Sequence, residues 1–368
     1  MSITIYSFYN NKGGVGKTTI CANTATLYAE KHPKTQVLVI DMCPQANISQ
    51  FLLGGGEKGY STNQQMQQSA TRKNIVGFVD WLIKGNSKFK TLGSIKSYLT
   101  RVSSYNDNIA NNLYLIAGDS FLESFSLALN YAVINPANTK AWLEYMTAIR
   151  RLCELEFKQD MYENLVVFID CNPSFSIYTQ MALVSSDRLL VPMMADFSSV
   201  EGIRGIFMLL YGEYPSSALK KYAENIITFN KKVKEFDIEP PKLWNFIFNN
   251  YTVKKEKDGS QQRIAKAFDS LRNELVDFCY KQYQKFPDFF AKNEQYFDSK
   301  EHWANFYVSG IKDLHTAGKV SSSLGIPVFK LPEHGYKYTM PDGEEVTVNK
   351  SRYEEALVNI NEFAAKIQ

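Results

Sequence analysis

The segment YNNKGGVGKTTI, from Tyr9 to Ile20, sets three glycines and two lysines between an alternating run, Ile3–Phe8, and a helical pattern. Glycines permit a tight turn in which successive backbone N–H groups point inward, and the start of the following helix adds a partial positive charge. A loop of this kind cradles a phosphate group. The N-terminal part of the chain is therefore expected to form a strand, a phosphate-binding loop and a helix.

The segment departs by one residue from the pattern G-x-x-x-x-G-K-[ST], because Asn11 stands at the first glycine position. In this pattern Lys17 contacts the β- and γ-phosphates, and the Thr18 hydroxyl binds Mg²⁺. A glycine-rich turn with incidental lysines is the alternative, but the strand before it and the helix after it argue against that interpretation. The nucleotide-binding residues expected here are Lys12, Gly13, Gly14, Val15, Gly16, Lys17, Thr18 and Thr19.

The stretch NNKGGVGKTT resembles the deviant Walker motif of the ParA/MinD group of P-loop ATPases, which carries an extra signature lysine. Lys12 stands at the position of that lysine. In the family, the signature lysine crosses an ATP-sandwich dimer and touches the phosphates bound by the other subunit. The resemblance therefore implies an ATP-dependent homodimer, with catalytic roles for Lys12 and Lys17. Cations at the developing charge are a main source of catalysis in phosphoryl transfer.

Two apolar runs that end in aspartate extend the resemblance. VLVIDMCPQANIS, residues 37–49, is similar to the family's D-x-D-P-Q-x-N switch, and NLVVFIDCNPSFS, residues 164–176, is similar to its Walker B stretch. Both runs are typical of buried parallel strands whose carboxyl ends face a ligand. The resemblance implies that Asp41 is catalytic and that Thr18, Asp41 and Asp170 hold Mg²⁺, with Asp170 acting through water.

Cys43 replaces the second aspartate of the switch, the residue to which the family gives the placing of the attacking water. A thiol is a poor hydrogen-bond acceptor and cannot take over this role. We expect slow ATP hydrolysis that depends on a partner. A nucleotide-gated regulator that binds DNA or protein with little or no hydrolysis is the alternative. Cys43 and Cys171 both follow predicted strands, so a redox switch is a further alternative to simple packing roles.

Strand and helix patterns alternate along the chain, which predicts an α/β fold: a doubly wound, mostly parallel β-sheet flanked by helices, in a single domain 1–368. LWNFIFNNYT, residues 243–252, is similar to a late strand of the family, and SLGIPVFKLPEHG, residues 323–335, is similar to its final strand and loop. These similarities imply that Asn249 and Pro327 contact the adenine. The polar stretch 54–74 reads as a flexible loop. Residues 253–322 are expected to form a helical insertion because apolar residues recur there at helical spacing.

Basic residues are concentrated in the second half of the chain. Residues 215–266 contain ten Lys and one Arg against six acidic residues, although the net charge of the whole chain is only +3. Such a patch favours nonspecific DNA binding through counterion release, which the ParA resemblance also implies, whereas a solvated lysine face is the alternative. The candidate DNA contacts are Lys220, Lys221, Lys231, Lys232, Lys234, Lys254, Lys255 and Lys257.

The resemblance also implies a ParB-like or cargo-linked adaptor as partner. Glu354, Glu355 and Glu362 give the C-terminal helical pattern an acidic polar face, unlike a membrane-surface helix, so we expect packing on the body and no membrane contact. With no apolar run of membrane length and no signal-peptide layout, a cytoplasmic, nucleoid-associated protein is expected. The five cysteines form no C-x-x-C pair, which disfavours a zinc site.

Two other enzyme classes share the phosphate-binding loop. A metal-cluster carrier or reductase of the same group presents a subunit-bridging cysteine pair, and no stretch of this sequence matches that pair convincingly. A small-molecule kinase has no use for a lysine at position 12. Both are weaker interpretations than a partition or positioning ATPase.

Overall fold

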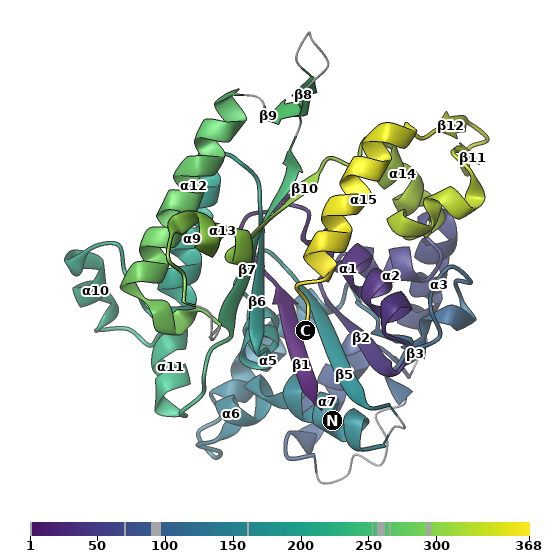
Figure 1. The fold of residues 1–368 in the computed structure, drawn as a ribbon. Helices are drawn as coiled ribbons and strands as arrows, with labels where there is room; N and C mark the ends of the chain where they lie inside the picture. Colours follow the sequence, from purple (N-terminus) through teal and green to yellow (C-terminus); the bar gives the residue numbers. More distant parts are fainter. Residues whose placement is uncertain are drawn as a thin grey trace.

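The central feature is an eight-stranded sheet in the order β10-β7-β6-β1-β5-β2-β4-β3, in a computed structural model that describes residues 2–69, 71–89, 97–159, 162–251, 253–255, 262–264, 266–291 and 296–368 (Figure 1). Every pair of neighbours is parallel except β3 and β4. The strands are β1 Ile3–Phe8, β2 Thr35–Met42, β3 Thr100–Arg101, β4 Leu113–Ile116, β5 Asn164–Cys171, β6 Arg188–Met193, β7 Lys242–Tyr251 and β10 Val308–Lys312. The predicted α/β, mostly parallel sheet is confirmed.

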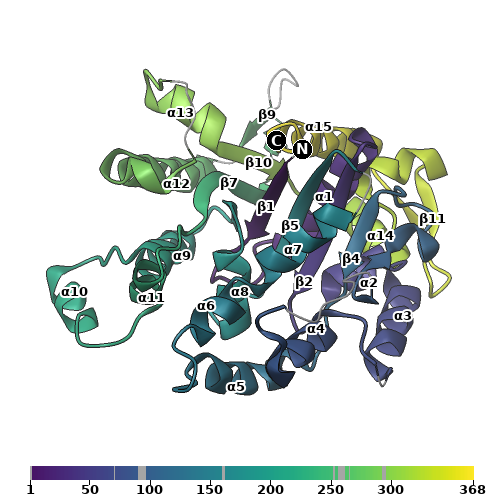
Figure 2. The ribbon, with the colours of Figure 1, turned by 90° about the horizontal axis from the view of Figure 1, so that it is seen from below.

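Helices cover both faces of this sheet, as Figure 2 shows from below. On one face lie α1 Lys17–Lys31, α2 Asn47–Leu52, α3 Gly56–Gln68, α14 His315–Leu324 and α15 Lys350–Ala364. On the other lie α4 Ile75–Trp81, α5 Leu122–Val133, α6 Ala141–Met146, α7 Ala148–Gln159, α8 Ile177–Val184, α9 Phe197–Ile206, α12 Lys266–Lys285 and α13 Lys300–Tyr307. The shorter α10 Ser217–Ala223 and α11 Phe229–Glu235 follow α9 at one side.

Alternate residues of each central strand enter different cores. Along β2, Leu38 and Ile40 belong to the core under α4–α9, whereas Val37 and Val39 belong to the core under α1 and α15. Because successive side chains of a strand point to opposite faces, a strand buried on both faces reads as a continuous apolar run. The structure thus explains why the apolar runs of β2 and β5 were visible in the sequence.

The loop predicted over residues 54–74 is wrong for most of its length, because Gly56–Gln68 forms helix α3. The buried stripe of α3 consists of Gly59, Asn63 and Gln67, so it has helical spacing but no apolar character. A Cβ at Gly59 would lie 1.9 Å from the Gln50 carbonyl oxygen, which shows how closely α3 packs on α2. A search for apolar periodicity cannot detect a polar stripe of this kind.

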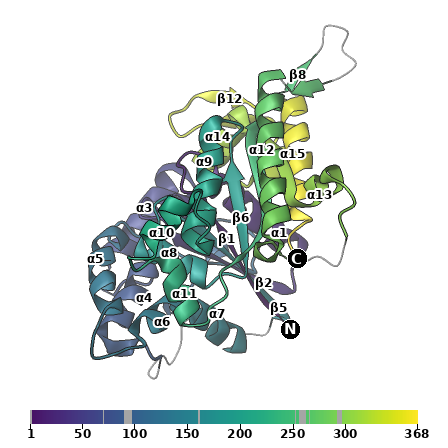
Figure 3. The same ribbon diagram turned by 90° about the vertical axis from the view of Figure 1, so that its left-hand side faces the viewer.

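The predicted helical insertion, 253–322, needs a similar correction. It does contain α12 and α13, and Figure 3 shows α12 beside α9. It also contains β10, which pairs in parallel with β7 and is part of the central sheet, and the short hairpin strands β8 Val253–Lys255 and β9 Gln262–Ile264. The five residues of β10, VSGIK, form too short and too polar a run to be recognised as a buried strand.

Residues 323–335, expected to hold the final strand and its loop, contain no strand: α14 ends at Leu324, and Val328–His334 forms a 3₁₀ helix, η6, with Pro332 inside it. The C-terminal helix α15 lies against α1 and β10, as expected for packing on the body. A small hairpin, β11 Lys337–Thr339 and β12 Glu345–Thr347, precedes it. None of the helices in the described part of the chain is long and apolar enough to span a membrane.

Candidate nucleotide-binding site

The loop between β1 and α1 turns through two glycines with left-handed backbone. Gly14 has a φ of 73° and Gly16 a φ of 86°, a region that residues with a Cβ rarely adopt. A Cβ at Gly16 would also lie 2.0 Å from Nδ2 of Asn249, so the close approach requires glycine as well. Gly13 faces open space. The loop therefore presents bare backbone next to the N-terminus of α1, as a phosphate-binding loop requires.

Lys17, the first residue of α1, turns back into this loop. Its Nζ donates hydrogen bonds to the carbonyl oxygens of Asn10, at 3.1 Å, and Lys12, at 2.9 Å. Burial lowers the pKa of Lys17, and the nearby charge of Asp170 opposes that effect. The ammonium group is thus held among the loop carbonyls, next to the backbone that would surround a phosphate.

Asp41 and Asp170 lie side by side near the carboxyl ends of β2 and β5, where they are partners in the parallel register. Both are fully buried, and Asp170 accepts a hydrogen bond of 2.7 Å from the Thr18 hydroxyl. Burial raises the pKa of Asp41 to about 6. Burial and then the charge of Asp41 raise the pKa of Asp170 to about 7. Two carboxyl groups and a hydroxyl are hard oxygen donors of the kind that Mg²⁺ prefers.

Ser49 of α2, supported by Gly118 from the loop that follows β4, fixes the orientation of Asp41. Ser49 donates to Asp41 from its hydroxyl, at 2.6 Å, and from its backbone N–H, at 3.2 Å. The same hydroxyl accepts a 2.8 Å hydrogen bond from the N–H of Gly118. A Cβ at Gly118 would lie 2.7 Å from Cγ of Asp41, so a glycine is needed at this approach.

Cys43 is buried beside this carboxyl pair. Its N–H donates to Asp41 at 3.0 Å, and its Sγ donates to Oε1 of Gln45 at 2.7 Å. Burial, followed by the charges of Asp41 and Asp170, raises the pKa of Cys43 to about 12. Burial also raises the pKa of Cys171. Both thiols therefore stay protonated near neutral pH, so neither can act as a base, and thiolate chemistry at this edge is disfavoured.

Lys12 points away from the interior of the loop and forms an ion pair with Asp196, the residue that caps the N-terminus of α9. Lys12 is half-buried, whereas Lys17 is buried. Partial burial of Asp196 acts to raise its pKa, but hydrogen bonds from Lys12, Ser198 and Ser199 outweigh this effect and lower it. The two lysines of the loop thus have different partners and differ in exposure.

The two residues expected at the adenine lie at different sides of the loop. Asn249, on β7, donates a 3.2 Å hydrogen bond to the carbonyl of Val15. Pro327 precedes Val328, whose N–H donates to Asn23 of α1 at 3.0 Å. Thr18, Thr19, Asn23 and Val328 are among the residues that line a cavity of about 360 Å³, which also borders α2 and α14. A cavity therefore extends from the expected metal-binding hydroxyl toward Pro327.

The candidate DNA contacts do not form one continuous patch. Lys220 and Lys221 are exposed on α10, but Nζ of Lys231 donates to three backbone carbonyls, those of Ala223, Glu224 and Ile226. On α11, Lys232 pairs with Glu235 at 2.8 Å and Lys234 is exposed. Lys254 and Lys255 belong to β8, which lies far from α10 in Figure 1, and Lys257 falls outside the described residues.

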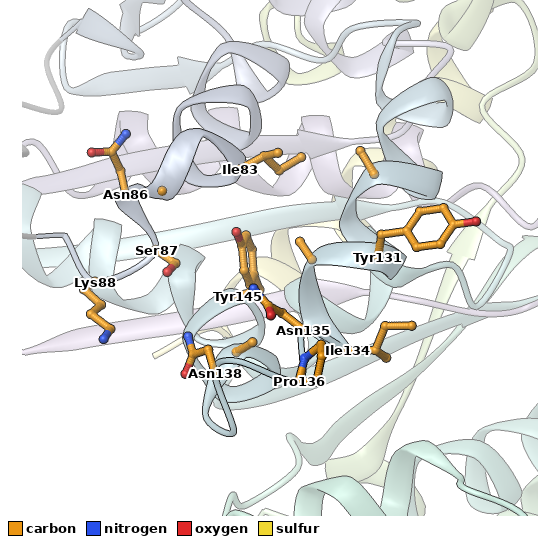
Figure 4. A pocket seen from close by; sticks show the side chains of 14 residues that line it. Ile83, Asn86, Ser87, Lys88, Tyr131, Ile134, Asn135, Pro136, Asn138 and Tyr145 are labelled. Carbon is orange, nitrogen blue, oxygen red and sulfur yellow. The ribbon is translucent and has the colours of Figure 1, made fainter.

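A cavity of about 1050 Å³ lies away from this site, between α5, α6 and the turn that follows α4 (Figure 4). Tyr131 and Tyr145 are among its lining residues, and none of the phosphate-loop residues is. Cavity size alone therefore does not identify the nucleotide site in this fold. The glycine-rich loop, Thr18 and the two aspartates instead lie together at the carboxyl ends of the central strands.

Sequence reasoning missed three residues that shape the site. Ser49 orients Asp41, Asn10 supports the loop, and Asp196 pairs with Lys12. Asn10 donates to the carbonyl of Pro192 at 2.8 Å and accepts from the N–H of Lys12 at 3.0 Å. A signal for Asp196 did exist, since an aspartate between an apolar strand and the residues Ser198-Ser199 is typical of a helix N-cap.

A glycine-rich loop at the switch from β1 to α1, facing carboxylates on the neighbouring strands, defines a P-loop nucleotide-binding protein. A family model described as AAA domain matches residues 3–211, more than half of the 368-residue chain. The chain belongs to this family and is a ParA/MinD-like P-loop ATPase.

Sequence relatives are distant. An uncharacterized protein of Methanocaldococcus jannaschii is 26% identical over 263 residues, which cover 71% of this chain and 78% of the relative. An uncharacterized protein of Pseudomonas putida is 25% identical over 199 residues, which cover 54% of this chain and 59% of the relative.

Solved structures share the fold over nearly the whole chain. Apo McdA from Cyanothece has a TM-score of 0.54 at 15% identity, covering 96% of this chain and 99% of that one. A candidate plasmid partition protein from Borrelia burgdorferi B31, solved with bound AMPPNP, has a TM-score of 0.50 at 19% identity, covering 99% of both chains. At these identities the likeness concerns the fold.

Proposed function

We propose that the chain is a ParA-like partition or positioning ATPase that binds ATP and Mg²⁺ and closes into a sandwich dimer. The observation that carries this proposal is that the two loop lysines have different partners and different exposure. Lys17 is buried among the loop carbonyls, whereas Lys12 carries a partly exposed ammonium on the outer side of the loop. An ammonium placed outside its own loop suits contact with a phosphate bound by a second subunit.

The described residues fit a magnesium nucleotide. Thr18, Asp41 and Asp170 would hold the metal ion, and Lys17 and the backbone of residues 13–19 would hold the phosphates. Lys12 would contact the phosphates that the second subunit binds. No group of three or more His, Cys, Asp and Glu side chains within the described ranges could bind a metal ion by itself. Oxygen atoms of the nucleotide and of water would complete the shell, which is usual for Mg²⁺. Asn249 and Pro327 remain the candidate adenine contacts.

We expect slow hydrolysis because of the side chains that the switch segment, residues 37–49, contains. Bound metal and nucleotide would supply the phosphoryl group and its charge compensation. The chain itself offers a protonated Cys43 and an Asp41 whose oxygens accept hydrogen bonds from Ser49 and from the Cys43 N–H. A thiol that keeps its proton cannot remove one from water. A ParB-like or cargo-linked partner would have to complete the arrangement that orients the water.

The first test is the oligomeric state of the purified full chain with and without ATP and Mg²⁺, measured by light scattering. Wild-type protein should dimerise only with nucleotide, and Lys12→Ala should stay monomeric while it keeps its nucleotide affinity. Wild-type protein that remains monomeric at saturating ATP would refute the proposal. Steady-state turnover should be slow in the same samples, and rapid hydrolysis without a partner would contradict the role given to Cys43.

DNA binding is the second part of the proposal, with the exposed lysines of α10 and α11 as its best-placed candidates. Binding of random-sequence duplex DNA should require ATP and should weaken steeply as salt rises. Lys220→Glu with Lys221→Glu should weaken it strongly. The matched control, Lys58→Glu with Lys350→Glu, changes the net charge equally at exposed positions on α3 and α15 and should have a much smaller effect.

If ATP-bound dimers form but neither hydrolyse ATP nor bind DNA, the second candidate function gains support. The chain would then be a nucleotide-gated regulator that presents its dimer to another macromolecule. The buried, protonated Cys43 is the observation that favours this alternative.

A further inference from the structure

The two oxygen atoms of the Asp196 carboxylate bind different partners. Its Oδ1 accepts hydrogen bonds from the N–H and hydroxyl of Ser199, both at 3.0 Å, and from the hydroxyl of Ser198, at 2.9 Å. Its Oδ2 faces the ammonium of Lys12. One oxygen therefore fixes the beginning of α9 while the other holds the signature lysine.

The backbone of the loop is tied to the same segment of chain. Asn10 bridges the carbonyl of Pro192, on β6, and the N–H of Lys12. Asp196 follows β6 by three residues, since β6 ends at Met193. The backbone N–H of Lys12 is thus linked through Asn10 to β6, and the Lys12 ammonium binds Asp196 at the start of α9.

The negative charge of Asp196 stabilises the Lys12 ammonium at the N-terminus of α9. The N-terminus of a helix carries a partial positive charge, which repels a cation. Hydrogen bonds from Lys12 and the two serines lower the pKa of Asp196 in spite of its partial burial, so the carboxylate is ionised at neutral pH. Without that negative charge, the ammonium of Lys12 would face the positive end of α9.

We propose that Asp196 is a positioning residue that holds Lys12 within its own subunit and thereby sets the ATP concentration at which two subunits close. This inference rests on the proposed function, because it requires Lys12 to leave Asp196 for a phosphate of the other subunit. Each dimer must break two such ion pairs. Asp196 thus opposes dimerisation in proportion to the strength of its contact with Lys12.

Two substitutions separate the ion pair from the helix cap. Asn and Ser are both good N-cap residues, so Asp196→Asn and Asp196→Ser should keep the start of α9 and lose the charge. A partly exposed ion pair changes an equilibrium by up to about fivefold, and two pairs in a dimer by up to about 25-fold. Both variants should therefore dimerise at a several-fold lower ATP concentration than wild-type protein.

The experiment is an ATP titration of the full chain with Mg²⁺, followed by light scattering, for wild-type protein and both variants. A second readout needs no dimer: acetylation of Lys12 in nucleotide-free protein, followed by mass spectrometry. An ammonium released from Asp196 should react several-fold faster, whereas Lys350, an exposed lysine far from the site, should react at an unchanged rate. Thermal melting checks that both variants are folded.

The outcomes distinguish this inference from the proposed function. If wild-type protein never dimerises with ATP, the proposed function fails, and the inference fails with it. If wild-type protein dimerises but both variants need the same or a higher ATP concentration, Asp196 does not restrain Lys12 and the proposed function stands. An unchanged acetylation rate of Lys12 in both variants would equally overturn the inference.

Discussion

Asp41 and Asp170 are two carboxyl groups buried next to each other, and their hydrogen bonds come from Ser49, Cys43 and Thr18. The pKa of Asp170 is about 7 in the folded chain, against about 3.9 in an unfolded one. Between these values the folded state binds more protons than the unfolded state. The stability of the nucleotide-free protein should therefore fall as the pH rises from about 4 to about 7.

The variant Asp170→Asn tests this predicted dependence of stability on pH. The amide oxygen can still accept from Thr18, but the variant carries no buried charge beside Asp41. Because one pKa unit is worth about 1.4 kcal/mol, the variant should be more stable than wild type at pH 8 by about 2 to 4 kcal/mol. This gain should shrink as the pH approaches 4.

Urea unfolding of the nucleotide-free protein at several pH values measures this difference. Asp342→Asn, at an exposed turn, serves as the control and should change stability little at any pH. A variant less stable than wild type at pH 8 would show that Lys17 and Thr18 stabilise the ionised Asp170 more than burial disfavours it.

Among the helices, α9 packs closely against the phosphate loop through two of its glycines. A Cβ at Gly202 would lie 2.9 Å from Oδ1 of Asn10, and a Cβ at Gly205 would lie 2.5 Å from Nδ2 of Asn11. The side chains of Asn10 and Asn11 differ in how freely they can move. Asn10 is buried and hydrogen-bonded to Pro192 and Lys12, whereas Asn11 is exposed and can turn away.

Alanine at these two positions should therefore have opposite effects. In a helix interior, alanine is favoured over glycine by up to about 1 kcal/mol. Gly205→Ala should be neutral or stabilising, because only the exposed Asn11 must move. Gly202→Ala should destabilise by about 1 to 3 kcal/mol through overpacking against Asn10, and it should weaken nucleotide binding. Denaturant unfolding and ATP titration measure both variants, and equal behaviour of the two would contradict this account of the loop.

Elements with a strong apolar signal were predictable and those with a polar interior were not. The strands that carry Asp41 and Asp170, and the helical pattern that became α12, were identified because burial on a strand or on a helix stripe leaves a periodic apolar run. Helix α3 was missed because it buries Asn63 and Gln67. Strand β10 was missed because an edge strand of five residues needs little apolar surface.

At the scale of the whole molecule, Tyr6 joins the centre of the sheet to the C-terminal segment. Its hydroxyl donates to the carbonyl of Gln368 at 3.0 Å and accepts from the Gln368 N–H at 3.0 Å. Arg188 on β6 also donates to the Tyr6 hydroxyl, at 2.6 Å, and the Arg188 guanidinium stacks over Trp244 of β7. One hydroxyl on the central strand thus holds two strands and the segment that follows α15.

Tyr6→Phe should consequently lower the free energy of unfolding by about 1 to 3 kcal/mol, since it removes three partly buried hydrogen bonds, one of them from the charged Arg188. Urea unfolding measures the loss, and hydrogen exchange should show earlier opening of the residues after α15. Tyr222→Phe, at a tyrosine that is 69% exposed, is the control and should change stability by less than about 0.5 kcal/mol. Equal stability of wild type and Tyr6→Phe would rule out this connection.

The phosphate loop, the two strands that carry Asp41 and Asp170 and the alternating α/β order were predictable because they depend on local patterns: glycine where the backbone turns left-handed, and apolar runs where strands are buried. The contacts of the loop side chains became known only from the folded structure. The pairing of Lys12 with Asp196, the support of Asp41 by Ser49 and Gly118, and the use of Lys231 as a cap for α10 join residues that the chain brings together only on folding. Such contacts depend on distance in space, which no local pattern encodes.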